Sequence, residues 1–173
     1  SYRYGDHTYE GMVFPQALRQ FIAYDEMNVF VTQKAHQTAW PYLEEMNDDR
    51  IKAVGIPDGR TPEERWLIFD QLLSVVKDGD TLIFDITHGY RTLFFFVFLA
   101  IAFLKSAREN VTVQRVLCGE LVQSETPGPG PVIDLTEYIS LLDWMSATDQ
   151  FVKFGNSQAL VQLVREAAAS GKD

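Results

Sequence analysis

Short continuous apolar runs alternate along this chain with longer segments in which apolar residues recur at helical spacing. The short runs are rich in β-branched and aromatic residues and predict strands at residues 27–32, 51–56, 81–86, 111–118 and 131–135. The longer segments predict helices at residues 33–46, 61–76, 89–107, 136–153 and 157–168. This alternation predicts an α/β protein with a Rossmann-like, mostly parallel sheet and helices on both faces.

Individual residues refine these elements. Pro41 marks a break in the first helix, and Thr61-Pro62 followed by Glu64 is typical of a capped helix start. The run 81–86 is almost continuously apolar, which favours a strand covered on both faces. The helix at 89–107 is apolar nearly all round, so we expect it to be deeply buried. Its apolar run Leu93–Leu104 has 12 residues, too few for the ~20 that span a bilayer, so no membrane association is expected.

Composition narrows the classes of function. A length of 173 residues suits one domain. The net charge of -9 argues against binding to duplex nucleic acid, although one small anionic ligand in a local positive site remains compatible. One cysteine, Cys118, excludes an internal disulfide and fits a reducing compartment, so a cytoplasmic protein is expected. The three histidines show no metal-ligand spacing, His7 and His36 are expected at the surface, and neither a metal nor a cofactor is expected.

The segment Asp85-Ile86-Thr87-His88-Gly89-Tyr90-Arg91 concentrates candidate binding groups where a predicted strand passes into a helix. Ligands of open α/β sheets bind at the carboxyl ends of the strands. Gly89 permits a close backbone approach, the helix start offers free N–H groups, and Arg91 adds a fixed positive charge. Together with Thr87, His88 and Tyr90, these groups suit an anionic phosphodiester. The other strand ends, Thr32-Gln33-Lys34 and Gly119-Glu120, are additional candidate walls.

Two other interpretations of this segment stay open from the residues alone. Asp85 and Thr87 are also suited to capping the next helix, with His88 and Arg91 simply solvated. The second interpretation is a Rossmann-like domain that binds a nucleotide cofactor. It is the less favoured one, because the chain lacks the G-x-G-x-x-G pattern that such a domain carries after a strand.

The same string, Asp85 to Arg91, resembles the DxTHG motif of a group of CRISPR-associated proteins with a CARF domain. Supporting similarity covers nearly the whole chain. It is carried by Tyr2-Arg3-Tyr4-Gly5-Asp6, Ile56-Pro57-Asp58-Gly59, Glu63-Glu64-Arg65-Trp66, Ile133-Asp134-Leu135-Thr136 and Leu142-Asp143-Trp144.

The resemblance implies a sensor of cyclic oligoadenylate, the second messenger of type III CRISPR antiviral defence. Such domains are Rossmann-like homodimers that bind the ring across the two-fold interface and control an attached effector. Cyclic tetra-adenylate is the favoured ligand, and the hexa-adenylate is the second choice. The residues implied to bind it are Thr87, His88, Gly89, Tyr90 and Arg91, with Thr32, Gln33, Lys34, Gly119 and Glu120 as further walls inferred from topology. Some relatives cleave the ring without metal, and in that alternative His88 is the candidate catalytic residue.

The chain departs from the family pattern at both ends. Relatives usually begin with a strand and a glycine-containing loop, yet here only Ser1 stands before Tyr2-Arg3-Tyr4. Either that first strand is missing from this chain or this member lacks it. Many relatives also carry a ribonuclease domain with Arg-x4–6-His, which is not found here. We therefore expect a sensor domain at 1–153 and, at 154–173, a helix that begins a linker to an effector outside this chain.

Overall fold

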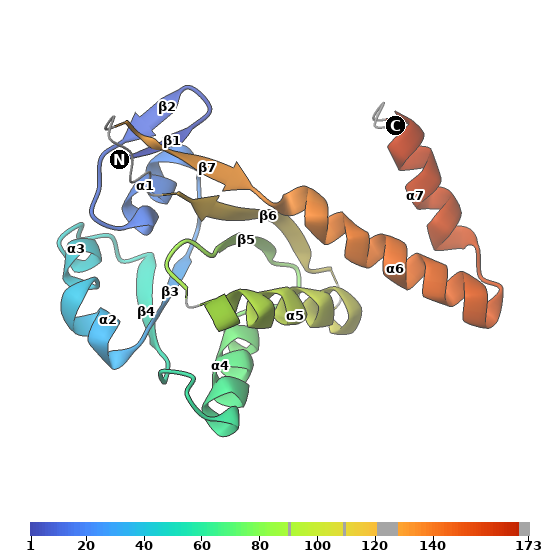
Figure 1. The fold of residues 1–173 in the computed structure, drawn as a ribbon, viewed down its shortest axis with the longest axis horizontal. Helices are drawn as coiled ribbons and strands as arrows, with labels where there is room; N and C mark the ends of the chain where they lie inside the picture. The colour runs from blue at the N-terminus through green and yellow to red at the C-terminus, as the bar shows by residue number, and fades with distance from the viewer. Residues whose placement is uncertain (90, 109, 121–127, 170–173) are drawn as a thin grey trace. The chain divides into compact units, whose positions relative to one another are not determined.

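The computed structural model describes residues 1–89, 91–108, 110–120 and 128–169 (Figure 1). They belong to two compact units that meet between Ile133 and Asp134. Each unit is described by itself. The functional division expected at residue 153 stays a prediction.

The first unit contains every strand of the described chain. Its elements are β1 (Tyr2–Tyr4), β2 (His7–Tyr9), α1 (Phe14–Phe21), β3 (Met27–Val31), α2 (Gln33–Thr38), α3 (Pro41–Glu44), β4 (Ile51–Gly55), α4 (Pro62–Ser74), β5 (Thr81–Asp85), α5 (Arg91–Ala107), β6 (Thr112–Gly119) and β7 (Gly130–Asp134). The five predicted strands are confirmed to within one or two residues, and a new helix begins at Pro41 as predicted. Thr61 caps α4 by accepting a 3.2 Å hydrogen bond from the Glu64 N–H. Elements β1, β2 and α1 were not predicted.

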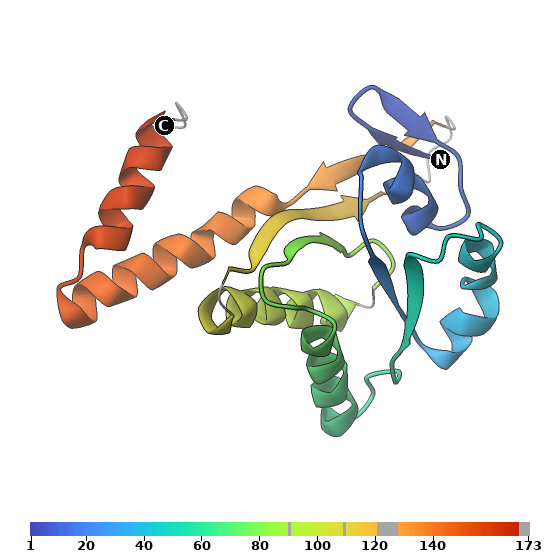
Figure 2. The same ribbon diagram turned by 180° about the vertical axis from the view of Figure 1, so that it is seen from behind.

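Parallel pairing dominates the strands, which confirms the Rossmann-like α/β class. The pairs β3–β4, β5–β6 and β1–β7 are parallel, and β1–β2 is antiparallel. The strands nevertheless form two sheets rather than one, in the orders β2-β1-β7-β6-β5 and β3-β4. Both views show β3 and β4 side by side and separate from the β5–β6 pair (Figure 1 and Figure 2).

One cluster of buried apolar side chains in the first unit lies between the N-terminal elements and the end of β6. Tyr2, Phe14, Ala17 and Leu117 are fully buried, and the Tyr2 and Phe14 rings meet edge to face at 5.0 Å. The two rings pack against the backbone of Gly119, which leaves no room for a side chain there. A Cβ there would lie 2.7 Å from Cδ2 of Phe14 and 3.1 Å from Cδ1 of Tyr2. Only glycine therefore fits at the end of β6, against the aromatic pair.

The expectation that the 89–107 helix is buried all round was wrong. One face of α5 is buried through Val97, Ala100, Ile101 and Leu104. The opposite face exposes Phe95 by 62% and Phe103 by 47%. The Phe103 ring meets the Phe69 ring of α4 edge to face, with the ring centres 6.0 Å apart. A single helix lying on a sheet buries the face toward the strands, and its other side needs a further layer. In the described chain α4 supplies only part of that layer.

The second unit is a pair of helices, α6 (Thr136–Phe154) and α7 (Gln158–Ala169), which pack on each other. Both were predicted. Gly155 ends α6 in the left-handed conformation at φ 67°, and its N–H donates to the Phe151 carbonyl. None of the helices in the described part of the chain has the length and apolar character needed to cross a membrane.

Candidate functional site

The turn that follows β5 is fixed by hydrogen bonds to the end of β6. The Ile86 N–H continues the parallel pairing by donating to the Leu117 carbonyl at 3.0 Å. Oδ1 of Asp85 accepts from the Thr87 N–H at 2.8 Å, which folds the chain back in an Asx turn. Oγ1 of Thr87 then accepts from the Gly119 N–H at 2.7 Å. The motif is thereby held at the carboxyl ends of two neighbouring parallel strands.

His88 ties the same turn to helix α1. Its Nε2 accepts a 3.1 Å hydrogen bond from the Phe14 N–H, the first backbone donor of that helix. The residue before it, Val13, has no side-chain acceptor, so His88 takes the place of an N-cap from 74 positions away in the sequence. Because Nε2 accepts, this bond assigns the proton of the neutral ring to Nδ1.

The groups behind the turn disfavour negative charge. The Asp85 carboxyl is crowded by protein atoms, and this desolvation raises its pKa, although its bonds with Thr87 act in the opposite direction. Burial, and then the charge of Asp85, raise the pKa of Tyr2, whose fully buried hydroxyl has no hydrogen-bond partner among the described residues. Burial and the same carboxyl also raise the pKa of Cys118. An anionic ligand at this edge therefore requires positive groups on the outer side of the turn.

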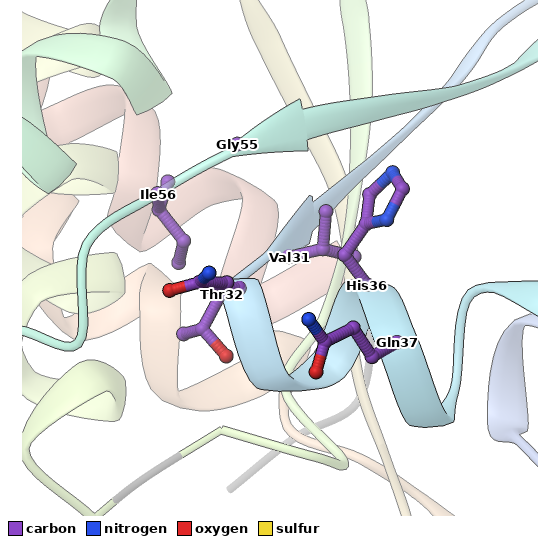
Figure 3. A pocket seen from close by; sticks show the side chains of 7 residues that line it. Val31, Thr32, His36, Gln37, Gly55 and Ile56 are labelled. Carbon is purple, nitrogen blue, oxygen red and sulfur yellow. The ribbon is translucent and has the colours of Figure 1, made fainter.

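A pocket opens at the carboxyl ends of the other parallel pair, β3 and β4 (Figure 3). Its volume is 340 Å³. Seven residues line it: Val31, Thr32, Gln33, His36, Gln37, Gly55 and Ile56. Thr32 is the N-cap of α2, since its Oγ1 accepts from the Ala35 N–H at 3.2 Å. The His36 ring stacks on Trp40 with the ring centres 6.2 Å apart and the planes 21° apart.

The structure thus divides the predicted site residues between two places. Thr87, His88 and Gly119 share the turn, and the Glu120 N–H beside them donates to the Pro131 carbonyl at 3.0 Å. Gly89 follows in the same turn. Tyr90 lies outside the described residues, and Arg91 begins α5. At the pocket, Thr32 and Gln33 are lining residues. Lys34 is exposed and is not among the lining residues.

The sequence interpretation missed four pocket residues: His36, Gln37, Gly55 and Ile56. A usable signal was present, because Gln33 and Gln37 are four residues apart and share one side of a helix. His36 was taken as an isolated surface residue, and its exposure agrees with that. Within the described ranges no three His, Cys, Asp or Glu side chains are grouped so that they could hold a metal ion.

Comparison with known proteins places this α/β chain beside a CRISPR-associated protein. No protein-family model matches the chain. It is 29% identical over 129 residues to CRISPR-associated protein MJ1674 of Methanocaldococcus jannaschii, an alignment that covers 71% of this chain and 20% of that protein. The chain therefore spans about a fifth of the length of this relative. The similarity supports a CRISPR-associated protein.

Proposed function

We propose that this chain is a receptor domain for cyclic oligoadenylate, with cyclic tetra-adenylate as the favoured ring. One observation carries the proposal: the DxTHG turn is held rigidly at the carboxyl ends of β5 and β6, directly before a helix of 17 residues. The similarity to a CRISPR-associated protein supports the same assignment. In this proposal the domain serves a type III CRISPR defence system and controls an effector.

The chemistry of the turn suits a ring of phosphodiesters. The first N–H groups of α5 have no partners within the helix, and the helix dipole makes this end positive. Arg91 begins that helix and adds a full positive charge. Since the chain carries a net charge of -9, attraction of an anion depends on these local groups and not on the overall field.

A cyclic ligand with repeated identical units fits a two-fold receptor. Each subunit of a homodimer presents the same patch, so a symmetric ring meets two copies of Arg91 and of the α5 start. We therefore propose a homodimer with the ring bound across its axis. Binding would favour one arrangement of the two subunits, which is the change an effector can detect.

The residues of the motif have two roles in this proposal, positioning the turn and contacting the ligand. Thr87 and His88 use Oγ1 and Nε2 for bonds within the protein, to Gly119 and Phe14. We assign them to positioning the turn. The Thr87 hydroxyl also bonds to the Asp85 carboxyl, so the His88 Nδ1–H is the donor left toward a ligand. Gly89, Tyr90 and Arg91 then supply the close approach, a surface for stacking a base and the positive charge.

Calorimetric titration of cyclic tetra-adenylate and cyclic hexa-adenylate tests this function. Arg91→Ala removes the charged contact and should weaken binding of the preferred ring about 10- to 100-fold, because hydrogen bonds to charged groups contribute about 1.5–3 kcal/mol. Arg108→Ala is the matched control, since Arg108 lies just beyond the other end of α5 and pairs with Asp78 at 3.4 Å. Equal affinity of wild type and Arg91→Ala would contradict the assignment.

The recovered ligand decides between a receptor and an enzyme. We expect the ring to elute intact from a column after incubation. Linear products ending in a 2′,3′-cyclic phosphate, formed without metal, would instead assign a ring nuclease. In that case His88→Ala should slow cleavage more than it weakens binding, and equal turnover would remove His88 from the mechanism.

A further inference from the structure

We propose that the pocket at the ends of β3 and β4 binds one adenine base of the ligand, with the Gln33 and Gln37 amides at its edge. This inference rests on the proposed function, because a ring held at the β5 turn must place its bases somewhere. The pocket supplies a second, separate contact for that ring. With phosphate bound at the β5 turn and a base bound in the pocket, the receptor would recognise both parts of an adenosine phosphate.

The shape of the pocket suits a single flat group. Its 340 Å³ lies at the small end of ligand pockets, which hold about 300–1,000 Å³, so it accepts a part of the ring and not the whole. Val31 and Ile56 make its apolar wall. Gly55 leaves one side open, since a Cβ added there would meet no atom within 4 Å. A planar base can therefore lie against the exposed backbone of β4.

The polar groups of the pocket match the edge of adenine. Gln33 and Gln37 are four residues apart, so they lie one turn from each other on the same side of α2, and both are exposed. A glutamine amide offers one acceptor and one donor side by side, the arrangement that pairs with N7 and the N6 amino group of adenine. Figure 3 shows the Gln37 side chain pointing back along α2 toward Thr32. The Thr32 hydroxyl oxygen accepts from Ala35, so its O–H stays available as a further donor.

An aromatic surface and a favourable charge complete the site. His36 lines the pocket and is held by stacking on Trp40. Aromatic rings of this kind are the usual partners of unpaired bases. None of the seven lining residues is a carboxylate, although the chain has 24 acidic residues. Lys34, the residue after Gln33 in α2, adds a positive charge to the same helix. The pocket thus lacks the repulsion that would keep a phosphate-bearing base away.

Filling the pocket tests this inference without touching the β5 turn. Gly55→Val adds a side chain where there is open space, and valine is favoured in strands. Gln37→Leu removes the amide. Each change should weaken binding of cyclic tetra-adenylate about tenfold or more and leave the free energy of unfolding unchanged. The controls are Gly128→Val, also in open space, and Gln150→Leu, exposed on α6; both should bind like wild type.

The outcomes separate this inference from the function on which it rests. If the wild type binds the ring, Arg91→Ala weakens it and Gly55→Val leaves it unchanged, the receptor stands and the base pocket is overturned. If the wild type binds no ring, the receptor is overturned, and titration of adenosine 5′-monophosphate by NMR decides the pocket. Shifts at Gln33 and Gln37 that are smaller with guanosine 5′-monophosphate would keep a separate adenine site. No shifts at millimolar nucleotide would overturn the pocket as well.

Discussion

Two regions at carboxyl ends of parallel strands differ in how their polar groups are used. At the end of β5, the Thr87 N–H, the Thr87 Oγ1 and the His88 Nε2 are all bound to other parts of the protein. At the ends of β3 and β4, the Gln33, His36 and Gln37 side chains are exposed around an open pocket. The bonded groups of the first region hold the turn in place, whereas the exposed side chains of the second are available to contact a ligand. A substitution of one of the bonded groups in the first region should lower stability, and a substitution of one of the exposed groups in the second should weaken binding.

The largest expected effect is at Gly119, where the first region touches the core. Gly119→Ala would place a methyl group 2.7 Å from Phe14 and force the aromatic pair or the strand to move. Overpacking of this kind costs about 1–3 kcal/mol, and we expect the upper end because two rings are met. The measurement is the free energy of unfolding in urea. Gly55→Ala in the pocket is the control, and an equal loss in both proteins would break the comparison.

Substitution of Thr87 should cause the second-largest loss in the free energy of unfolding. Thr87→Val keeps the shape but leaves the Gly119 N–H without its acceptor, a loss of about 1–3 kcal/mol for a buried donor. Thr87→Ser retains the oxygen and should recover most of the stability. Unfolding curves that fail to separate valine from serine would show that the hydrogen bond contributes nothing.

His88 should have a smaller effect, comparable to that of a helix cap. His88→Ala removes the acceptor of the Phe14 N–H and should lower the free energy of unfolding by about 1 kcal/mol. His7→Ala changes an exposed histidine on β2 and should be neutral. A neutral result for both proteins would mean that α1 is not held through the motif.

The smallest effect is expected in the pH dependence of stability, through Asp85. Its pKa is raised above the ordinary 3.8 by desolvation, so the folded protein binds the proton more tightly than the unfolded chain does. Stability should therefore fall as the pH rises from 3.8 through the folded pKa, where the desolvated carboxyl becomes charged. Asp85→Asn keeps Oδ1 as acceptor for Thr87 and should flatten this fall. If stability fell equally steeply with pH in both proteins, desolvation of the Asp85 carboxyl would not be the cause of the fall.

Most of the fold could be predicted because its strands are apolar runs and its helices show regular spacing. Pro41 and Thr61 set helix boundaries through local chemistry, which a sequence displays directly. Strands β1 and β2 have three residues each, too few to show a period. The exposed face of α5 escaped prediction because the apolar pattern does not reveal how many layers cover a helix.

The candidate site was predictable only where its residues are consecutive. The motif from Asp85 to Arg91 is visible as a string, but the bond from Phe14 to His88 joins residues 74 positions apart. The pocket depends on the absence of a side chain at Gly55 and on the exposed side of α2. Both become recognisable once β3 and β4 are paired.

Hydrogen–deuterium exchange with and without cyclic tetra-adenylate tests the central claim most directly. Backbone exchange reports which segments a ligand covers, peptide by peptide. We predict slower exchange in the peptides spanning Ile86–Arg91 and Thr32–Gln37, with the peptides of α7 unchanged. Unchanged exchange at Ile86–Arg91 in a sample that binds the ring by calorimetry would contradict the account, because the ligand would then lie elsewhere on the chain.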